Sequence, residues 1–307
     1  MRMRTSGTAR ITGTMLTAAA IATAGFATAP AANATCASFF GLGNSADCTS
    51  TPLSIAIAIG NGAQAQANGL FGAAFSAGTG AASVTNDAFE FAIAAGDNTI
   101  VVTKGLFGIG LALGQGTSAG TQGDPNLGNL GFNIALNISP TNPGFYPVAA
   151  GGVGSLAVNL FGTSTTFGTK EVLSIGYLGL AVNVGGNNND VWTGGGILSS
   201  AFNLGGSDTS VKSGEGFLDN ATNLGGSGNT VYANPGPLAI AVSVGQTGAV
   251  VSKQQPGINI NGFKIPNTAA AINSGKKARP AAASSRANDD NGSSGKRSTG
   301  GSGRSGR

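Results

Sequence analysis

The residues that could perform chemistry in this 307-residue chain are few, and histidine is not among them. Without histidine, the chain lacks the commonest general base and metal ligand, and Ser–His or Cys–His nucleophile systems are excluded. Asp190, Asp208, Glu215 and Asp219 fall within one short segment, and glycoside hydrolysis needs two carboxylates about 5–10 Å apart. Asp190 and Asp208 occupy different positions in their repeats, and no arginine accompanies them between residues 35 and 260. We interpret these acids as solvated corner residues and expect no catalytic activity.

Three aromatic residues and a lysine that share one position of the repeat form a second candidate site. Tyr146, Trp192, Lys212 and Tyr232 each follow a residue that we predict to face inward, so they are predicted to point outward. Aromatic rings spaced along a rigid rod suit stacking against sugars or apolar ligands. Scattered surface aromatics are also normal in proteins, so both interpretations stay open.

A possible calcium motif is weaker. The sequence GGNNNDVW (residues 185–192) matches half of the nonapeptide that binds calcium in parallel β-helices. The equivalent segments GGSDTSVK and GGSGNTVY lack the acidic residue at that position. We therefore expect neither a metal site nor a cofactor.

Asparagines repeat at one position of successive repeats. Stacked amides can form a hydrogen-bonded ladder that stabilises the stacking of strands. The alternative is an exposed amide array that binds a repeating polymer, and we favour the structural interpretation. The residues of this column are Asn137, Asn159, Asn183, Asn203 and Asn223.

The asparagines occupy the small polar position of a short sequence motif, Ala–apolar–small polar–apolar–Gly. This motif recurs about every twenty residues. A repeat of this length, rich in Gly and Asn, is typical of a solenoid, in which each turn packs on the next. The sequence predicts an all-β fold, a three-sided parallel β-solenoid of about ten turns over residues 53–260. The ten copies end at Gly60, Gly78, Gly96, Gly114, Ser139, Phe161, Gly185, Gly205, Gly225 and Gly245.

Three columns of large apolar residues recur at fixed distances from the end of this motif, and we predict that all three face the core. The first comprises the apolar residues one and three positions before its end, such as Ile57 and Ile59. The second lies seven or eight positions before the end, as at Phe89, and the third six positions after it, as at Val191. Insertions at residues 121–129, 139–147 and 185–196 interrupt the pattern, and we expect them to be loops on one face.

The first 34 residues resemble a cleavable secretory signal. Arg2, Arg4 and Arg10 precede an apolar segment, and Ala32 and Ala34 form an A-x-A cleavage signature. Export predicts an oxidising environment, in which Cys36 and Cys48 would pair. We expect a disulfide-clasped cap over residues 35–52 and a secreted or envelope-associated protein.

Charge is divided along the chain. Residues 35–260 hold four lysines and ten acids, whereas residues 261–307 hold nine basic residues and two acids. The segment 261–307 has almost no large apolar side chain, so we predict a disordered basic tail. Such a tail attracts anionic envelope components or simply aids solubility. We expect no specific nucleic-acid binding.

The segments CASFFGLGNSADCTS and LSIAIAIGNGAQAQANGLFGAAF, followed by NLGG repeats, resemble a group of exported mycobacterial proteins rich in Ala, Gly and Asn. The residue pattern of the repeats is also similar to that of PGRS regions and of the solenoid heads of trimeric autotransporter adhesins. The resemblance implies surface exposure and contact with a host or the cell wall, and it implies no catalytic residue. The sequence therefore favours a structural or interaction protein. The alternatives are a glycan-binding module or adhesin and, third, a polysaccharide-active β-helix enzyme.

Overall fold

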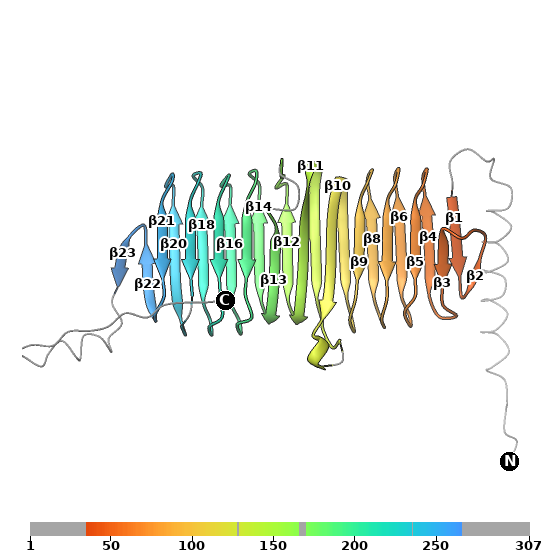
Figure 1. The fold of residues 1–307 in the computed structure, drawn as a ribbon, viewed down its shortest axis with the longest axis horizontal. Coiled ribbons are helices and arrows are strands. Elements are labelled where there is room, and N and C mark those ends of the chain that lie inside the picture. The colour runs from red at the N-terminus through yellow and green to blue at the C-terminus, as the bar shows by residue number, and fades with distance from the viewer. Residues whose placement is uncertain (1–34, 128, 166–169, 235, 266–307) are drawn as a thin grey trace, which may run out of the picture. The chain divides into compact units, whose positions relative to one another are not determined.

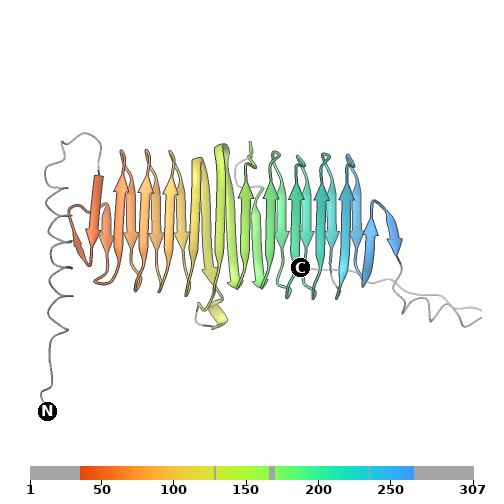
Figure 2. The same ribbon diagram turned by 180° about the vertical axis from the view of Figure 1, so that it is seen from behind.

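The computed structural model describes residues 35–265, except residues 128, 166–169 and 235 and the side chains of residues 143–146. The predicted signal peptide and residues 266–307 lie outside the described residues. The described chain is an all-β parallel solenoid of about ten turns, whose rungs lie side by side along one axis (Figures 1 and 2).

Each turn of the coil contributes one strand to each of two parallel ladders. Strands β10 (Ile109–Gly123) and β11 (Ile134–Val153) are long enough to serve both ladders. The first ladder contains β4 (Ile55–Ile59), β6 (Ala73–Ala77), β8 (Phe91–Ala95), β10, β11, β12 (Leu156–Leu160), β14 (Leu180–Val184), β16 (Ser200–Leu204), β18 (Asn220–Leu224), β20 (Ala239–Val244) and β22 (Gly257–Ile260). The second ladder contains β3 (Cys48–Ser50), β5 (Gln64–Ala67), β7 (Ala82–Thr85), β9 (Ile100–Thr103), β10, β11, β13 (Val172–Tyr177), β15 (Asp190–Thr193), β17 (Ser210–Ser213), β19 (Thr230–Ala233) and β21 (Val250–Lys253).

The prediction of three strand-forming sides was wrong, because the second apolar column forms a corner. Phe71, Phe89 and Phe107 have φ of 55°, 57° and 63°, and Leu198 and Leu218 have φ of 57° and 58°. This left-handed backbone cannot continue a strand. Each turn therefore has two strands and two corners.

The predicted direction of the first column was also wrong. Along β4 the buried residues are Ala56 and Ala58, whereas Ile55, Ile57 and Ile59 face outward. A strand's alternation separates its residues into two faces, but it does not say which face is inside. The third column is confirmed from Val191 onward, where the valines of the second ladder are buried, whereas Val84 faces outward.

The core between the ladders is thin. Among the described residues, the buried apolar side chains are alanine, valine and the two cysteines, with no buried Leu, Ile or Phe. Small residues let the two sheets approach closely, and larger residues at the same positions would force them apart. The large aliphatic side chains therefore lie on the outside of the coil.

The predicted asparagine ladder is present inside this core. Asn159, Asn183, Asn203 and Asn223 each donate a side-chain hydrogen bond to the amide oxygen of the preceding asparagine, at 2.7–2.8 Å. All five members of the column are 0% exposed. The ladder therefore stabilises the stacking of turns, and the alternative of an exposed polymer-binding amide array is contradicted.

Antiparallel strands cover both ends of the first ladder. β1 (Thr35–Phe39) pairs with β4 and with the short β2 (Leu42–Gly43), and β23 (Phe263–Ile265) pairs with β22. Such covering strands keep the ladder edges from pairing with other chains. The expected boundary of the tail at residue 261 was therefore wrong, because Phe263–Ile265 form a strand of the fold.

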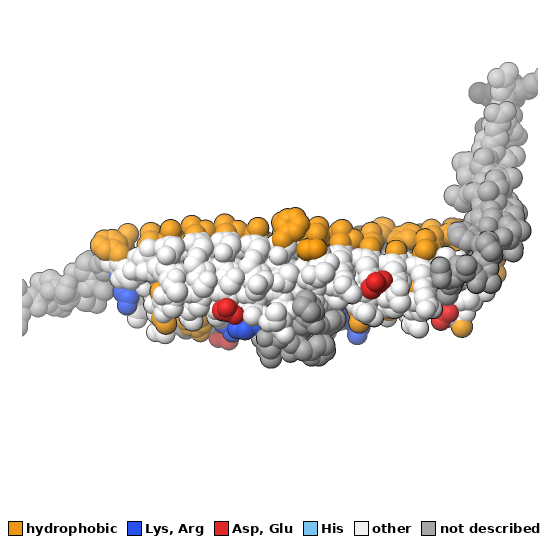
Figure 3. All heavy atoms as spheres, turned by 90° about the horizontal axis from the view of Figure 1, so that it is seen from above, with side chains coloured by type: hydrophobic (Ala, Val, Ile, Leu, Met, Phe, Trp, Pro, Cys, Tyr) orange, Lys and Arg blue, Asp and Glu red, His pale blue; other side chains and the backbone are white. Residues whose placement is uncertain are grey.

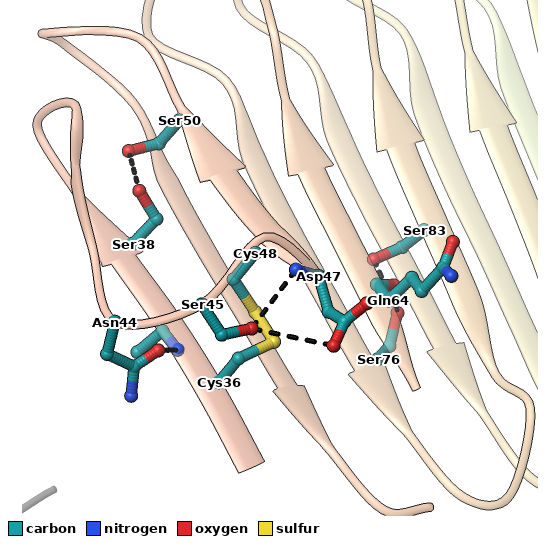
Figure 4. The surroundings of a disulfide bond; sticks show 11 residues. Cys36, Ser38, Asn44, Ser45, Asp47, Cys48, Ser50, Gln64, Ser76 and Ser83 are labelled. Atoms are coloured by element: carbon teal, nitrogen blue, oxygen red, sulfur yellow. Dashed lines mark hydrogen bonds between the residues drawn. A yellow bond between two sulfur atoms is a disulfide. The ribbon is translucent and has the colours of Figure 1, made fainter. Parts of the chain in front are cut away.

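The Cys36–Cys48 disulfide is present and joins the two ladders at the N-terminal end (Figure 4). Cys36 is in register with Ala58 of the first ladder, and Cys48 is in register with Ala65 of the second. The bridge therefore spans the core at the positions that the buried Ala58 and Ala65 occupy in the next turn.

The expected insertions are only partly loops. Residues 139–147 lie within the continuous strand β11, which bends from one ladder to the other. Residues 185–196 form a corner followed by β15. Of the segment 121–129, residues 121–123 are the end of strand β10, and only the chain beyond them leaves the coil and carries the 3-10 helix η1 (Pro125–Leu127).

We predict that Asn183→Ala destabilises the protein by about 2–4 kcal/mol, because it leaves buried partners on Asn159, Asn189 and Asn203 without their bonds. The outward-facing Gln66→Ala is the matched control and should change stability by less than about 0.5 kcal/mol. Denaturant unfolding of both variants measures the difference. Equal stabilities would contradict a stabilising role for the ladder.

Candidate interaction surfaces

The outward side chains of the first ladder form a largely apolar face, here called the apolar plane, which is interrupted by the polar Ser200, Asn220 and Thr222. Phe91 is 48% exposed and Ile109 is 43% exposed. Figure 3 shows hydrophobic side chains along one whole edge of the described body. The middle row of the plane consists of Ile57, Phe75, Ile93, Leu111, Leu136, Val158, Val182, Phe202, Thr222, Val242 and Ile260.

Charge is excluded from this plane. In the described first-ladder strands, no outward position holds Asp, Glu, Lys or Arg. Soluble monomers rarely expose contiguous apolar patches beyond a few hundred Å². A larger uncharged patch marks an interaction site rather than ordinary surface.

An apolar corner continues the plane along part of one margin. Phe71, Phe89, Phe107 and Phe132 stack in order, with ring centroids 5.2, 5.0 and 4.7 Å apart. Later turns place exposed leucines at this corner, among them Leu198 and Leu218. The spacing of the repeat predicted these columns but not their outward direction, so the surface that they form was not expected from the sequence.

The opposite face, on the second ladder, carries most of the predicted aromatic strip. Trp192, Lys212 and Tyr232 are consecutive partners in register on β15, β17 and β19. The Lys212 ammonium lies 2.8 Å from Asp190 and 6.0 Å from the centroid of the Trp192 ring. Tyr146 is in register with Thr117, which places it outside this row, and its side chain is not among those described.

A shallow trough lies beside this strip on the same face. Two adjoining hollows of about 420 and about 300 Å³ share Gln122, Gly151 and Ile175. Small residues leave the space, and the Tyr177 hydroxyl donates a hydrogen bond to Asp124 at 3.3 Å across one end. The trough offers apolar walls with a few polar groups, a combination found in small-ligand sites.

The four acids Asp190, Asp208, Glu215 and Asp219 lie in different surroundings. Asp190 is paired with Lys212, Asp208 and Glu215 are exposed at corners, and Asp219 is fully buried. The expectation of a solvated corner was therefore wrong for Asp190, which is the first residue of strand β15, and for Asp219, whose carboxylate accepts a hydrogen bond from the Ala239 backbone. Among the described residues, no group of three potential acidic or thiol ligands is placed to hold a metal.

Glu90 is a buried carboxyl that the sequence did not single out. It is 0% exposed, and one oxygen accepts hydrogen bonds from the backbone nitrogens of Asn86 and Asp87 at 2.6 and 2.8 Å. Its other oxygen has no partner and lies beside Gly108, as does the unpartnered Thr121 hydroxyl. Burial raises the pKa of Glu90 to about 7, which makes it a structural group that titrates near neutrality.

Comparison with protein-family models, with curated proteins and with solved structures finds no match to this chain. Within the residues that the structure describes, no helix has the length and apolarity that crossing a bilayer requires. The function must therefore be argued from the two faces themselves.

We predict that Glu90 makes the folded state less stable as pH rises from about 4.5 to 7. A carboxyl whose folded pKa is raised favours folding below its unfolded pKa, and that stability is lost as pH rises through the folded pKa. Glu90→Gln should remove about 2–3 kcal/mol of this loss, since a neutral amide can keep the two backbone hydrogen bonds. Unfolding curves between pH 4 and 8 measure it.

The matched control is Asp208→Asn, which removes an acidic charge at an exposed corner. It should retain the pH profile of the unmodified protein. If Glu90→Gln gave that profile too, the titration of Glu90 would not contribute to stability.

Proposed function

We propose that this chain is an exported, non-catalytic interaction rod whose apolar plane is its binding surface. The observation that supports this proposal is the uncharged apolar face, which extends over successive turns of the coil. Backbone hydrogen bonds join these turns. Hydrogen bonds between rungs and the buried asparagine ladder hold the face in shape. A preordered face loses little conformational entropy when it binds.

The setting of this function is the envelope or the exterior of the cell. The A-x-A signature before Thr35 supports export, and the Cys36–Cys48 disulfide suits an oxidising compartment. The nine basic residues from residue 261 onward supply an electrostatic contact with anionic envelope components. The absence of histidine from the sequence and the dispersed acids support a role without catalysis.

The test replaces two middle-row residues, Leu111→Ser and Val182→Ser, and measures how much protein co-fractionates with cell-envelope fragments. The loss of apolar area should weaken association by roughly ten-fold or more. The matched control, Val84→Ser with Val102→Ser, removes outward apolar side chains from the second ladder. Equal co-fractionation of the two double variants would contradict the proposal.

A second candidate function is glycan binding on the opposite face. The register of Trp192, Lys212 and Tyr232 favours it, and so does the adjoining trough near Tyr177. Aromatic rings on one rigid face can stack against successive sugar rings of a wall polymer or host glycan. Asp190 and Lys212 would add polar contacts beside the rings.

For this candidate we predict that Trp192→Ala with Tyr232→Ala lowers retention on purified cell-wall glycans by roughly ten-fold, because two stacking surfaces are lost. Phe217→Ala, an exposed aromatic residue at the apolar corner, is the control and should not change retention. Affinity chromatography measures all three proteins. Unchanged retention of the double variant would exclude the strip as a glycan site.

A further inference from the structure

The apolar plane needs an occupant, and the rest of this chain is poorly suited to provide one. The 42 residues that follow Ile265 contain one large apolar residue, Ile272. The predicted signal peptide would be removed on export. The rows of Ile, Leu, Val and Phe on the plane therefore require a partner outside the chain, because apolar area in contact with water is unfavourable.

The positions of the lysines disfavour a lipid surface as that partner. Proteins that lie on membranes place basic residues beside the apolar face that they bury. Here Lys212 is on the outer side of the second ladder, and Lys104 lines the trough on that same face. Figure 3 shows basic side chains away from the apolar edge.

The size of the plane matches what a stable dimer buries. Eleven strands at about 4.8 Å and five residues at about 3.3 Å each give about 870 Å² on one copy. Two copies would bury about 1,700 Å², which is within the range of specific protein–protein interfaces. An uncharged surface also brings no like charges together when it meets itself.

We propose that the apolar plane packs face to face on the apolar plane of a second copy of this chain. This inference rests on the proposed function, and it names the partner of the same surface. Envelope association then depends on the plane indirectly, because a dimer brings two copies of the basic segment that begins at residue 261 to the envelope. The dimer is isologous, with its two-fold axis lying in the interface. Four β-sheets then stack, and the outer faces with Trp192 and the trough stay free on both sides.

The middle row identifies the residue that tests this arrangement best. Val158 lies on β12, which has five first-ladder strands before it and five after it. With full overlap, the axis runs along either the rods or the strands, and in both cases Val158 faces Val158 of the partner copy. A substitution there acts twice at the centre of the interface.

The experiment uses the mature chain, residues 35–307, in analytical ultracentrifugation over a range of concentrations without envelope material. We expect a dimer. Val158→Lys should weaken it by roughly 100-fold or more, because two ammonium groups would meet in a buried apolar interface. Ile100→Lys, an exposed outward position of the second ladder, is the matched control and should stay dimeric. Thermal unfolding of the Val158→Lys monomer checks that it is folded.

A second measurement does not depend on disrupting the interface. Both natural cysteines are in the disulfide, so Val158→Cys introduces a single thiol. A short bis-maleimide should link two copies of this variant, whereas Ile100→Cys should stay unlinked. Linking of neither variant, or of both equally, would overturn the face-to-face arrangement.

The outcomes separate this inference from the proposed function. A monomeric chain whose co-fractionation still depends on Leu111 and Val182 overturns the dimer and leaves the interaction role in place. A monomeric chain without that dependence overturns both. A dimer that Val158→Lys leaves intact also overturns the arrangement, because its interface would then lie on another surface.

Discussion

The narrow space between the two ladders is the constraint on which the rest of this structure depends. It accepts Ala, Ser, Thr, Asn and Val, and the largest fully buried side chain among the described residues is the single Glu90. Apolar burial per residue is small in such a core. Stability must therefore come largely from repetition, in hydrogen bonds between rungs and in the asparagine ladder.

The same constraint produces the surface to which we assign function. Large aliphatic residues cannot enter the core, so they occupy the outward positions of the strands. On the first ladder they form an uncharged plane, and at the corner they stack as the Phe71–Phe89–Phe107–Phe132 column. A protein with a thicker core would have buried these residues, and its repeats would carry a polar exterior. In this protein the large apolar side chains lie on the surface, where they are available for association.

The two faces of the rod therefore have different chemistry. The first ladder presents apolar side chains that favour a flat, apolar partner, whereas the second presents Trp192, Lys212 and Tyr232 beside the trough. A dimer through the first face would leave the second accessible on both sides. Self-association and glycan binding are therefore compatible uses of one molecule, since neither surface covers the other.

The repeat by itself determined the parallel solenoid, the number of turns and the asparagine ladder, and the predicted export signal led to the pairing of Cys36 with Cys48. These follow from spacing and residue type, which local sequence records directly. Only the tertiary structure decided which side of each strand is buried. Alternation divides the residues of a strand into two sets, and the distance between the two sheets decides which set faces the core. It also decided that bulky residues such as Phe89 turn a corner, and that Asp219 and Glu90 lie inside. The apolar plane emerges only when the distance between sheets is set, since that distance excludes Leu, Ile and Phe from the core.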